Sequence, residues 1–200
     1  MAISAETVMK LREKTGQGMM QCKRALEEAG GDAEKAVEIL RKKGLATADK
    51  KSSRATAQGR VHSYIHHNGK VGVMVEVACE TDFVAKNEQF QAFLSDLCMH
   101  ICAAVPVPLA VRREEIPAGL VEKEREFARG QVTNKPAAII EKIIEGKVNK
   151  WYSDHVLLEQ PFVKDQEQTV KDVLTALVAK IGENIVIKRF VRYEVGEMAE

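Results

Sequence analysis

Apolar positions in the first 44 residues recur three or four apart, which is the spacing of helices with one buried face. The pattern predicts three short helices, over 5–14, 19–29 and 33–44. Glycines separate them, and Asp32 is suited to cap the third because its carboxylate can accept from free backbone N–H groups. The three narrow apolar stripes can share one small core, so this stretch is predicted to form a three-helix module.

The stretch over 45–58 is polar, small and basic, and it predicts a linker with at most a nascent helix. We therefore expect two domains, residues 1–57 and residues 58–200. Beyond the linker the apolar period changes to two, over 61–65 and again over 71–77. Asn68-Gly69 lies between these runs and can adopt the positive φ of a tight turn, so two strands joined by a hairpin are predicted.

The remainder of the chain is predicted to be mostly helical. A helix over 87–104 ends before Pro106 and Pro108, and another runs from 114 to 129. A further helix restarts at Asn134-Lys135-Pro136, buries a stripe of isoleucines and ends at Gly146, before a short helix over 147–154. The stripe consists of Ile139, Ile140, Ile143 and Ile144.

Three segments complete the prediction: an extended stretch over 160–163, a helix over 169–181 and a final strand over 184–195. The fold class is then α+β, a three-helix module followed by a three-stranded antiparallel sheet packed on helices. Such a small sheet leaves edges that invite pairing with a second chain.

Composition and charge exclude several classes of protein. The chain has 200 residues, 45% hydrophobic and 30% charged, and a net charge of +1, so no global field draws it to nucleic acid or a membrane. The N-terminal residues do not resemble a signal peptide, and no apolar run approaches the length of a membrane span. We expect a cytoplasmic protein.

Alternative chemistries find little support. Residues 1–57 hold 12 Lys/Arg and 8 Asp/Glu, a local net of +4 without interleaved aromatic residues, which favours a solvated face over a nucleic-acid site. Cys98 and Cys102 could share a helix face, and His62 and His66 a strand face, but neither pair has further ligands at metal-site spacing. No phosphate-binding glycine motif or nucleophile elbow is present, so no catalytic residue, cofactor or resident metal is expected.

The run over 79–87 joins the second strand to a long helix. By spacing alone, Thr81 or Asp82 caps the helix and Phe83 is buried, because aromatic side chains usually are. A resemblance changes that interpretation. Thr81-Asp82-Phe83-Val84 is similar to the signature of the elongation factor Ts family, and the run over 11–26 is similar to its N-terminal signature. Three further runs, over 64–67, 160–163 and 181–185, match the family in order along nearly the whole chain.

The resemblance implies a function without covalent chemistry. The family binds the GTPase elongation factor Tu and speeds GDP release, and the chain would act on GDP and Mg²⁺ held by that partner. Thr81, Asp82, Phe83 and Val84 would enter beside the nucleotide, with Phe83 as the wedge that disturbs the Mg²⁺ and phosphate site. Asp82 would either hold the segment through hydrogen bonds or repel phosphate oxygens.

The same resemblance implies further contacts with Tu. The N-terminal module is similar to a ubiquitin-associated fold, and Leu11, Arg12, Met19 and Met20 would touch the nucleotide domain of Tu. At least one of these methionines is also expected in the module's core. His66 and His67, at the hairpin end, would help to hold the partner. A module that acts only as a ubiquitin-like adaptor is the alternative function, and it would leave the 79–87 run without a role.

Chain length indicates which members of the family are most similar. Longer members carry a duplicated core and a projecting helical hairpin, whereas this chain has one Thr-Asp-Phe-Val run and one main hairpin. It resembles the short members, which pair into homodimers through their sheets and would give a 2:2 complex with Tu. The strand over 189–193 is the candidate edge for that pairing.

Overall fold

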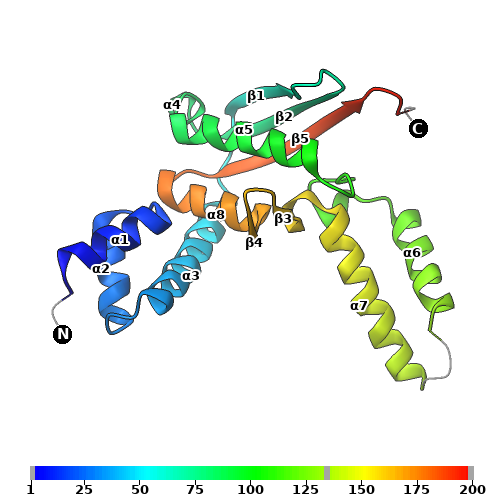
Figure 1. The fold of residues 1–200 in the computed structure, drawn as a ribbon, viewed down its shortest axis with the longest axis horizontal. Helices are drawn as coiled ribbons and strands as arrows, with labels where there is room; N and C mark the ends of the chain where they lie inside the picture. The colour runs from blue at the N-terminus through cyan, green and yellow to red at the C-terminus, as the bar shows by residue number, and fades with distance from the viewer. Residues whose placement is uncertain (1–2, 133–135, 198–200) are drawn as a thin grey trace. The chain divides into compact units, whose positions relative to one another are not determined.

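The computed structural model describes residues 3–132 and 136–197 as an α+β fold (Figure 1). Its helices are α1 (Ala5–Thr15), α2 (Met19–Glu28), α3 (Ala33–Lys51), α4 (Asp82–Ala85), α5 (Glu88–Ala103), α6 (Ala118–Gly130), α7 (Ala137–His155) and α8 (Val170–Ile181), with the 3-10 turns η1 (Arg113–Glu115) and η2 (Leu157–Glu159). Its strands are β1 (Gln58–Ile65), β2 (Val71–Cys79), β3 (Pro161–Phe162), β4 (Asp165–Thr169) and β5 (Ile185–Glu194). The first two and the last form the predicted three-stranded antiparallel sheet, in the order β1-β2-β5.

The chain divides into two compact units, each built from several stretches of sequence. The first unit holds the chain up to Gly59 together with Ala78–Asn87 and Leu174–Val186. The second unit holds Arg60–Val77, Glu88–Val173 and the chain from Ile187 onward. The first stretch ends near the expected boundary after residue 57, although two later segments join the same unit. The functional division into residues 1–57 and 58–200 stays a prediction.

The first unit contains the predicted three-helix module, and the ends of its helices have local causes. The Ser4 hydroxyl accepts from Thr7 N–H at the start of α1, and Gly16, with φ of 66°, ends that helix. Asp32 caps α3 as predicted, because its carboxylate accepts from two backbone N–H groups. Side chains from all three helices form the core of the module: Val8, Leu11, Cys22, Ala25, Leu26, Ala36 and Leu40.

The prediction that Gly44 ends the third helix is wrong, since α3 continues to Lys51 through the first half of the expected linker. A Cβ atom built on Gly44 would lie 3.6 Å from the Cβ of Ala179 on α8. This glycine therefore marks a close approach of two helices instead of a helix end. Lys50 and Lys51 of the expected linker lie on this helix, whereas Arg54 lies beyond its end.

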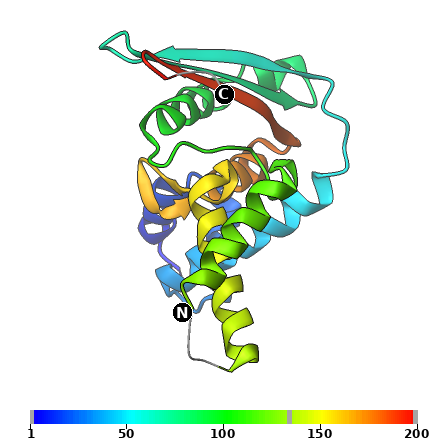
Figure 2. The ribbon, with the colours of Figure 1, turned by 90° about the vertical axis from the view of Figure 1, so that its right-hand side faces the viewer.

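The three-stranded sheet follows the predicted alternation. Val71, Val73, Val75 and Val77 point to the buried side, and the β1–β2 hairpin turns at Gly69, whose φ is 67°. Helix α5 covers that side of the sheet (Figure 1), and Ser95 on α5 lies within hydrogen-bond distance of His62 on β1 (3.1 Å). Within residues 3–132 and 136–197, no helix covers the opposite side of the sheet (Figure 2).

Helices α6 and α7 lie side by side as an antiparallel pair (Figures 1 and 2). Ala128, Ile144 and Val148 form the centre of their contact. The prediction that Gly146 ends a helix is wrong, because α7 continues through it to His155. The expected isoleucine stripe is only partly buried, since Ile139 is exposed. The expected helix start at Asn134 and Lys135 lies outside the described residues.

A short hairpin was not foreseen in the region over 160–169. The expected extended stretch is β3, and it pairs antiparallel with β4. β4 is almost entirely polar and partly exposed, so it carries no apolar alternation that would have indicated a strand.

Candidate functional site

The 79–87 segment, here meaning residues 79 to 87, is a single turn of helix held between a strand and a long helix. β2 ends at Cys79, α4 occupies Asp82–Ala85, and α5 begins at Glu88. Thr81 caps α4, because its hydroxyl accepts from Val84 N–H (3.4 Å). The capped turn points successive side chains in different directions, which decides which of them a partner can reach.

Phe83 is the exposed side chain of this turn. It is 80% exposed, whereas the adjacent Val84 is only 8% exposed. The core position that spacing alone favoured for Phe83 is therefore excluded. Val84 was grouped with the wedge, but its side chain is buried and anchors the turn. An aromatic ring this exposed is unusual for a structural residue and is typical of a contact surface.

Asp82 lies beside Phe83 in the first turn of α4. Its carboxylate accepts from Lys86 Nζ (2.8 Å), and this hydrogen bond is the main reason why the pKa of Asp82 lies below its ordinary value. Asp82 is therefore ionised at neutral pH, with a cation four residues along the chain. Asp82 was expected either to hold the segment or to repel phosphate oxygens, and this ion pair supports the first role.

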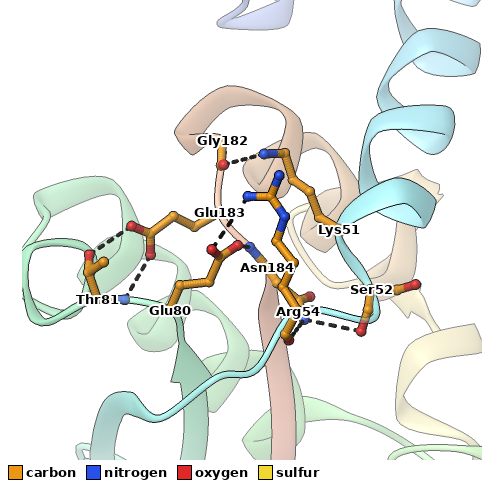
Figure 3. A network of polar contacts seen from close by, with 8 residues as sticks. All are labelled: Lys51, Ser52, Arg54, Glu80, Thr81, Gly182, Glu183 and Asn184. Atoms are coloured by element: carbon orange, nitrogen blue, oxygen red, sulfur yellow. Dashed lines mark hydrogen bonds and ion pairs between the residues drawn. The ribbon is translucent and has the colours of Figure 1, made fainter.

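A polar network joins the start of the 79–87 segment to the turn between α8 and β5 (Figure 3). Glu183 accepts from Thr81 N–H (3.0 Å) and from the Thr81 hydroxyl (2.7 Å). Glu80 accepts from Asn184 N–H (2.6 Å), and this bond is the main cause that lowers the pKa of Glu80. Each carboxylate thus binds the backbone of the opposite segment.

Cys79 completes the base of the 79–87 segment. Its buried S–H donates to the carbonyl of Thr81 (3.1 Å), and burial raises the pKa of the thiol. Burial raises the pKa of the Cys98 thiol further, to about 12. Both thiols are therefore protonated at neutral pH and behave as structural groups.

The predicted contact residues of the N-terminal module do not all reach its surface. Arg12, Met19 and Met20 are exposed, and Met19 begins α2 directly after the glycine break. Leu11 is 3% exposed and packs in the module's core, so its side chain cannot make the direct contact that the resemblance implied. Neither methionine fills the core, and the expectation that at least one of them would do so is wrong.

His66 and His67 lie at the β1–β2 turn of the second unit. His66 Nδ1 is within hydrogen-bond distance of the Tyr64 hydroxyl (3.1 Å), and the two histidine rings are 4.2 Å apart. His67 is exposed, whereas His66 is half-buried. The role of the two histidines in holding Tu stays a prediction.

The described residues offer little support for a metal site, a membrane span or a nucleic-acid site. Within residues 3–132 and 136–197, no group of three or more His, Cys, Asp or Glu side chains is placed to hold a metal ion. In the same residues, no helix is both long and apolar enough to cross a membrane. Two basic residues of the 1–57 stretch make bonds within the protein: Lys43 pairs with Glu28 (2.6 Å), and Lys51 donates to the Gly182 carbonyl (2.5 Å).

Comparison with known proteins identifies the family. The model of the family described as elongation factor TS matches residues 47–197, which include the 79–87 segment. The chain is also 58% identical to elongation factor Ts of Geobacter metallireducens over 199 residues, covering 98% of this chain and 91% of that protein. The chain belongs to the elongation factor Ts family.

Two further members of the family match along nearly the whole of this chain. Elongation factor Ts of Carboxydothermus hydrogenoformans is 56% identical, over 98% of this chain and 90% of that protein. Elongation factor Ts of Fervidobacterium nodosum is 55% identical, over 98% of this chain and 100% of that protein. The elongation factor Ts resemblance seen in the motifs is therefore confirmed, including the short form of about this length.

Sequence reasoning missed the polar partners of the 79–87 segment. Glu80, Glu183 and Asn184 were each part of a quoted run, but no role was assigned to them. Glu80 directly precedes the matching run over 81–84, and Glu183 and Asn184 belong to the matching run over 181–185, about a hundred residues away. Nothing in local spacing indicates that these two runs meet.

Proposed function

We propose that this protein is the nucleotide exchange factor of elongation factor Tu, which binds Tu·GDP and promotes GDP release so that GTP can bind. The observation that carries the proposal is the exposed Phe83 ring, presented on a capped turn in which the adjacent Val84 is buried. The proposal places the exchange in the bacterial cytoplasm. It requires no covalent chemistry and no cofactor of the protein's own.

The mechanism follows from how Tu would hold its nucleotide. The phosphates of GDP carry concentrated negative charge, and Mg²⁺ neutralises much of it. A large, stiff, apolar side chain such as Phe83, inserted beside that site, displaces the groups that hold the metal ion and the phosphates. Thr81 and Val84 hold the turn from which the ring projects, and Asp82 stabilises this turn through its ion pair with Lys86.

Coupling between the two ligands of Tu is reciprocal. If this protein weakens GDP on Tu by some factor, GDP weakens the protein on Tu by the same factor. A ternary complex then forms transiently, and either ligand can leave it. The wedge therefore catalyses exchange in both directions, and the nucleotide that is more abundant determines the outcome.

The N-terminal module would supply part of the docking surface. Arg12, Met19 and Met20 are exposed on it, and methionine side chains adapt well to a partner surface. Leu11 would support them from the core of the module. At the β1–β2 turn, His67 is the more accessible of the two histidines and is the better candidate for direct contact.

A direct experiment tests the exchange function. Elongation factor Tu is loaded with a fluorescent GDP, and release into excess unlabelled GDP is followed with and without this protein. Acceleration that rises with protein concentration and saturates supports the proposal. Release at the spontaneous rate at every concentration overturns it, and the adaptor alternative would then be tested by binding to ubiquitin-like proteins.

We further propose that the protein forms a homodimer through its sheet, giving a 2:2 complex with Tu. β5, the predicted edge, is an outer strand of the sheet. The open side of the sheet adds a second feature, since it carries exposed apolar side chains from all three strands: Val61, Ile65, Met74, Val191 and Tyr193. Apolar side chains exposed on one side of a sheet are typical of an interface. Sedimentation as a monomer at micromolar concentration would contradict the dimer.

A further inference from the structure

Two backbone segments of the first unit face each other and exchange hydrogen bonds reciprocally (Figure 3). From the α8–β5 turn, Glu183 reaches the backbone N–H and the hydroxyl of Thr81, at 3.0 and 2.7 Å. From the end of β2, Glu80 reaches the backbone N–H of Asn184 at 2.6 Å. Carboxylate acceptors make stronger hydrogen bonds than neutral groups, so this pairing holds the two segments firmly together.

The direction of these bonds fixes the cap of α4. A threonine hydroxyl has one hydrogen and two lone pairs. Because the Thr81 hydrogen is donated to Glu183, a lone pair remains for Val84 N–H, which lies 3.4 Å away. Glu183 therefore selects the rotamer in which Thr81 can cap the helix. This matters because α4 has only four residues, and a single turn of helix does not hold itself in water.

The end of α3 braces the same turn from another side. Asn184 Nδ2 donates to the carbonyls of Ser52 (3.2 Å) and Arg54 (2.8 Å). Lys51 Nζ donates to the carbonyl of Gly182 (2.5 Å). The turn that carries Glu183 is thus itself fixed by three hydrogen bonds, two made by Asn184 and one by the carbonyl of Gly182. A braced acceptor can position Thr81, whereas a freely moving one could not.

We infer that Glu183 is a positioning residue for the exchange step, which holds Thr81 and thereby fixes the turn that presents Phe83. The inference rests on the proposed exchange function and adds a residue remote in sequence from the wedge. Glu183 does not touch the nucleotide of Tu in this scheme. It acts by reducing the number of orientations that the Phe83 ring explores before the ring meets its site.

Glu183→Gln is the informative variant, because glutamine keeps the shape and changes the hydrogen-bond chemistry. The amide oxygen can still accept from Thr81 N–H, but the NH₂ group is a donor where the carboxylate was an acceptor. The Thr81 hydroxyl must then turn its hydrogen away from residue 183, so its charge-assisted bond is lost and the rotamer that caps α4 is held less firmly. Thr81→Val removes the hydroxyl at similar volume, and Thr81→Ser keeps it. Glu38→Gln, at an exposed position on α3, is the matched control for loss of charge.

The experiment measures stimulated release of fluorescent GDP from Tu across a range of protein concentrations. For Glu183→Gln we expect the maximal rate to fall about tenfold, with the half-saturating concentration changed less than about threefold, as for loss of a charge-assisted hydrogen bond that orients one side chain. Thr81→Val is expected to behave in the same way. Thr81→Ser is expected to retain most of the rate, and Glu38→Gln to match the unaltered protein.

The Phe83→Ala background separates positioning from a general structural role. If Glu183 acts through the ring, Glu183→Gln causes little further loss of rate once the ring is absent. An equal loss in both backgrounds, or an unchanged rate for Glu183→Gln in the presence of Phe83, overturns the inference. If the unaltered protein itself fails to accelerate release, the proposed function is what has failed.

A second measurement does not depend on Tu. Amide hydrogen exchange of Val84 should be slow in the unaltered protein and at least about tenfold faster in Glu183→Gln, because the Thr81 cap is held less firmly. Helix α2 of the three-helix module provides an internal reference that should exchange equally in both. Equal protection of Val84 in the two proteins would show that Glu183 does not hold the turn. If Glu183→Gln does not fold, the comparison is made between Thr81→Val and Thr81→Ser.

Discussion

Replacing phenylalanine with alanine at three positions separates a contact role from a packing role. Phe83 is 80% exposed, Phe127 on α6 is 63% exposed, and Phe90 on α5 is 0% exposed. Full burial of a phenylalanine side chain contributes about 1.5–3 kcal/mol. The roughly one-fifth of Phe83 that is buried therefore contributes about 0.3–0.6 kcal/mol. Phe90→Ala should cost about 3–5 kcal/mol, because it also leaves a cavity.

These free energies convert to melting temperatures and exchange rates that one set of samples can test. For a chain of this size about 1 kcal/mol shifts Tm by about 2–4 °C, so Phe83→Ala should lower Tm by about 1–2 °C and Phe90→Ala by about 6–20 °C. In the Tu release assay, Phe83→Ala should reduce the maximal stimulated rate at least about tenfold. Phe127→Ala, the matched exposed control, should leave both Tm and rate nearly unchanged.

Two results would refute this reasoning. A fall in Tm of more than about 6 °C for Phe83→Ala would mean that the ring is packed in solution. A wild-type exchange rate for Phe83→Ala with unchanged Tm would mean that the exposed ring is not the wedge. Circular dichroism melts and stopped-flow fluorescence supply the two measurements.

Three further predictions concern other parts of the chain. Gly44→Ala should stabilise the protein by about 0.5–1 kcal/mol in thermal melts, since the added Cβ meets Ala179 at an ordinary 3.6 Å; Gly44→Leu should destabilise it, and the opposite order would contradict the packing. Burial lowers the pKa of His100, so the folded state binds fewer protons and stability should fall as pH drops below the ordinary value of 6.5; the difference in Tm between pH 7.5 and pH 5.5 should shrink in His100→Gln. Met74→Lys, on the open side of the sheet, should shift sedimentation from dimer to monomer while leaving Tm within a few degrees, and a persisting dimer would locate the interface elsewhere.

The neutral state expected of His100 has a geometric basis as well as a desolvation one. Its Nδ1 accepts from Val163 N–H (3.2 Å), so Nε2 carries the proton and donates to Gln160 Oε1 (3.0 Å). Protonation of Nδ1 would replace an acceptor by a donor facing another donor. His62 shifts in the same direction, since burial lowers its pKa too. Both groups favour the folded state above pH 6.5 and oppose it below, which sets the sign of the predicted change.

Local chemistry allowed much of the fold to be predicted. Gly16 and Asp32 set helix boundaries where expected, because positive φ and N-capping act within a few residues. Gly44 and Gly146 were misinterpreted as helix ends, although both lie within continuous helices. A glycine ends a helix only when the chain needs its positive φ, and at Gly44 the missing side chain instead admits a neighbouring helix. Sequence spacing cannot distinguish these two uses.

The candidate site was predictable only in part, for a related reason. The exposure of Phe83 opposes the usual burial of aromatic residues, and the family resemblance, not the spacing, indicated it. Leu11 illustrates the reverse error, since a residue within a matching motif proved to be part of the core. The carboxylates of Glu80 and Glu183 escaped notice because their partners lie 104 and 102 positions away along the chain. Hydrogen bonds of that separation leave no periodic trace in a sequence.

That separation also sets the order of events during synthesis. Thr81 leaves the ribosome about a hundred residues before its acceptor Glu183, which at about 5–20 residues per second is a delay of roughly 5–20 s. The three-helix module can bury its core during that interval, because all of its residues precede residue 45. The turn that carries Phe83 cannot be locked until Glu183 has been made, when about a twelfth of the chain remains to be synthesised. A nascent or truncated chain would therefore contain a folded three-helix module before the turn that carries Phe83 is ordered. Under the proposed function, it could bind Tu before it could promote GDP release.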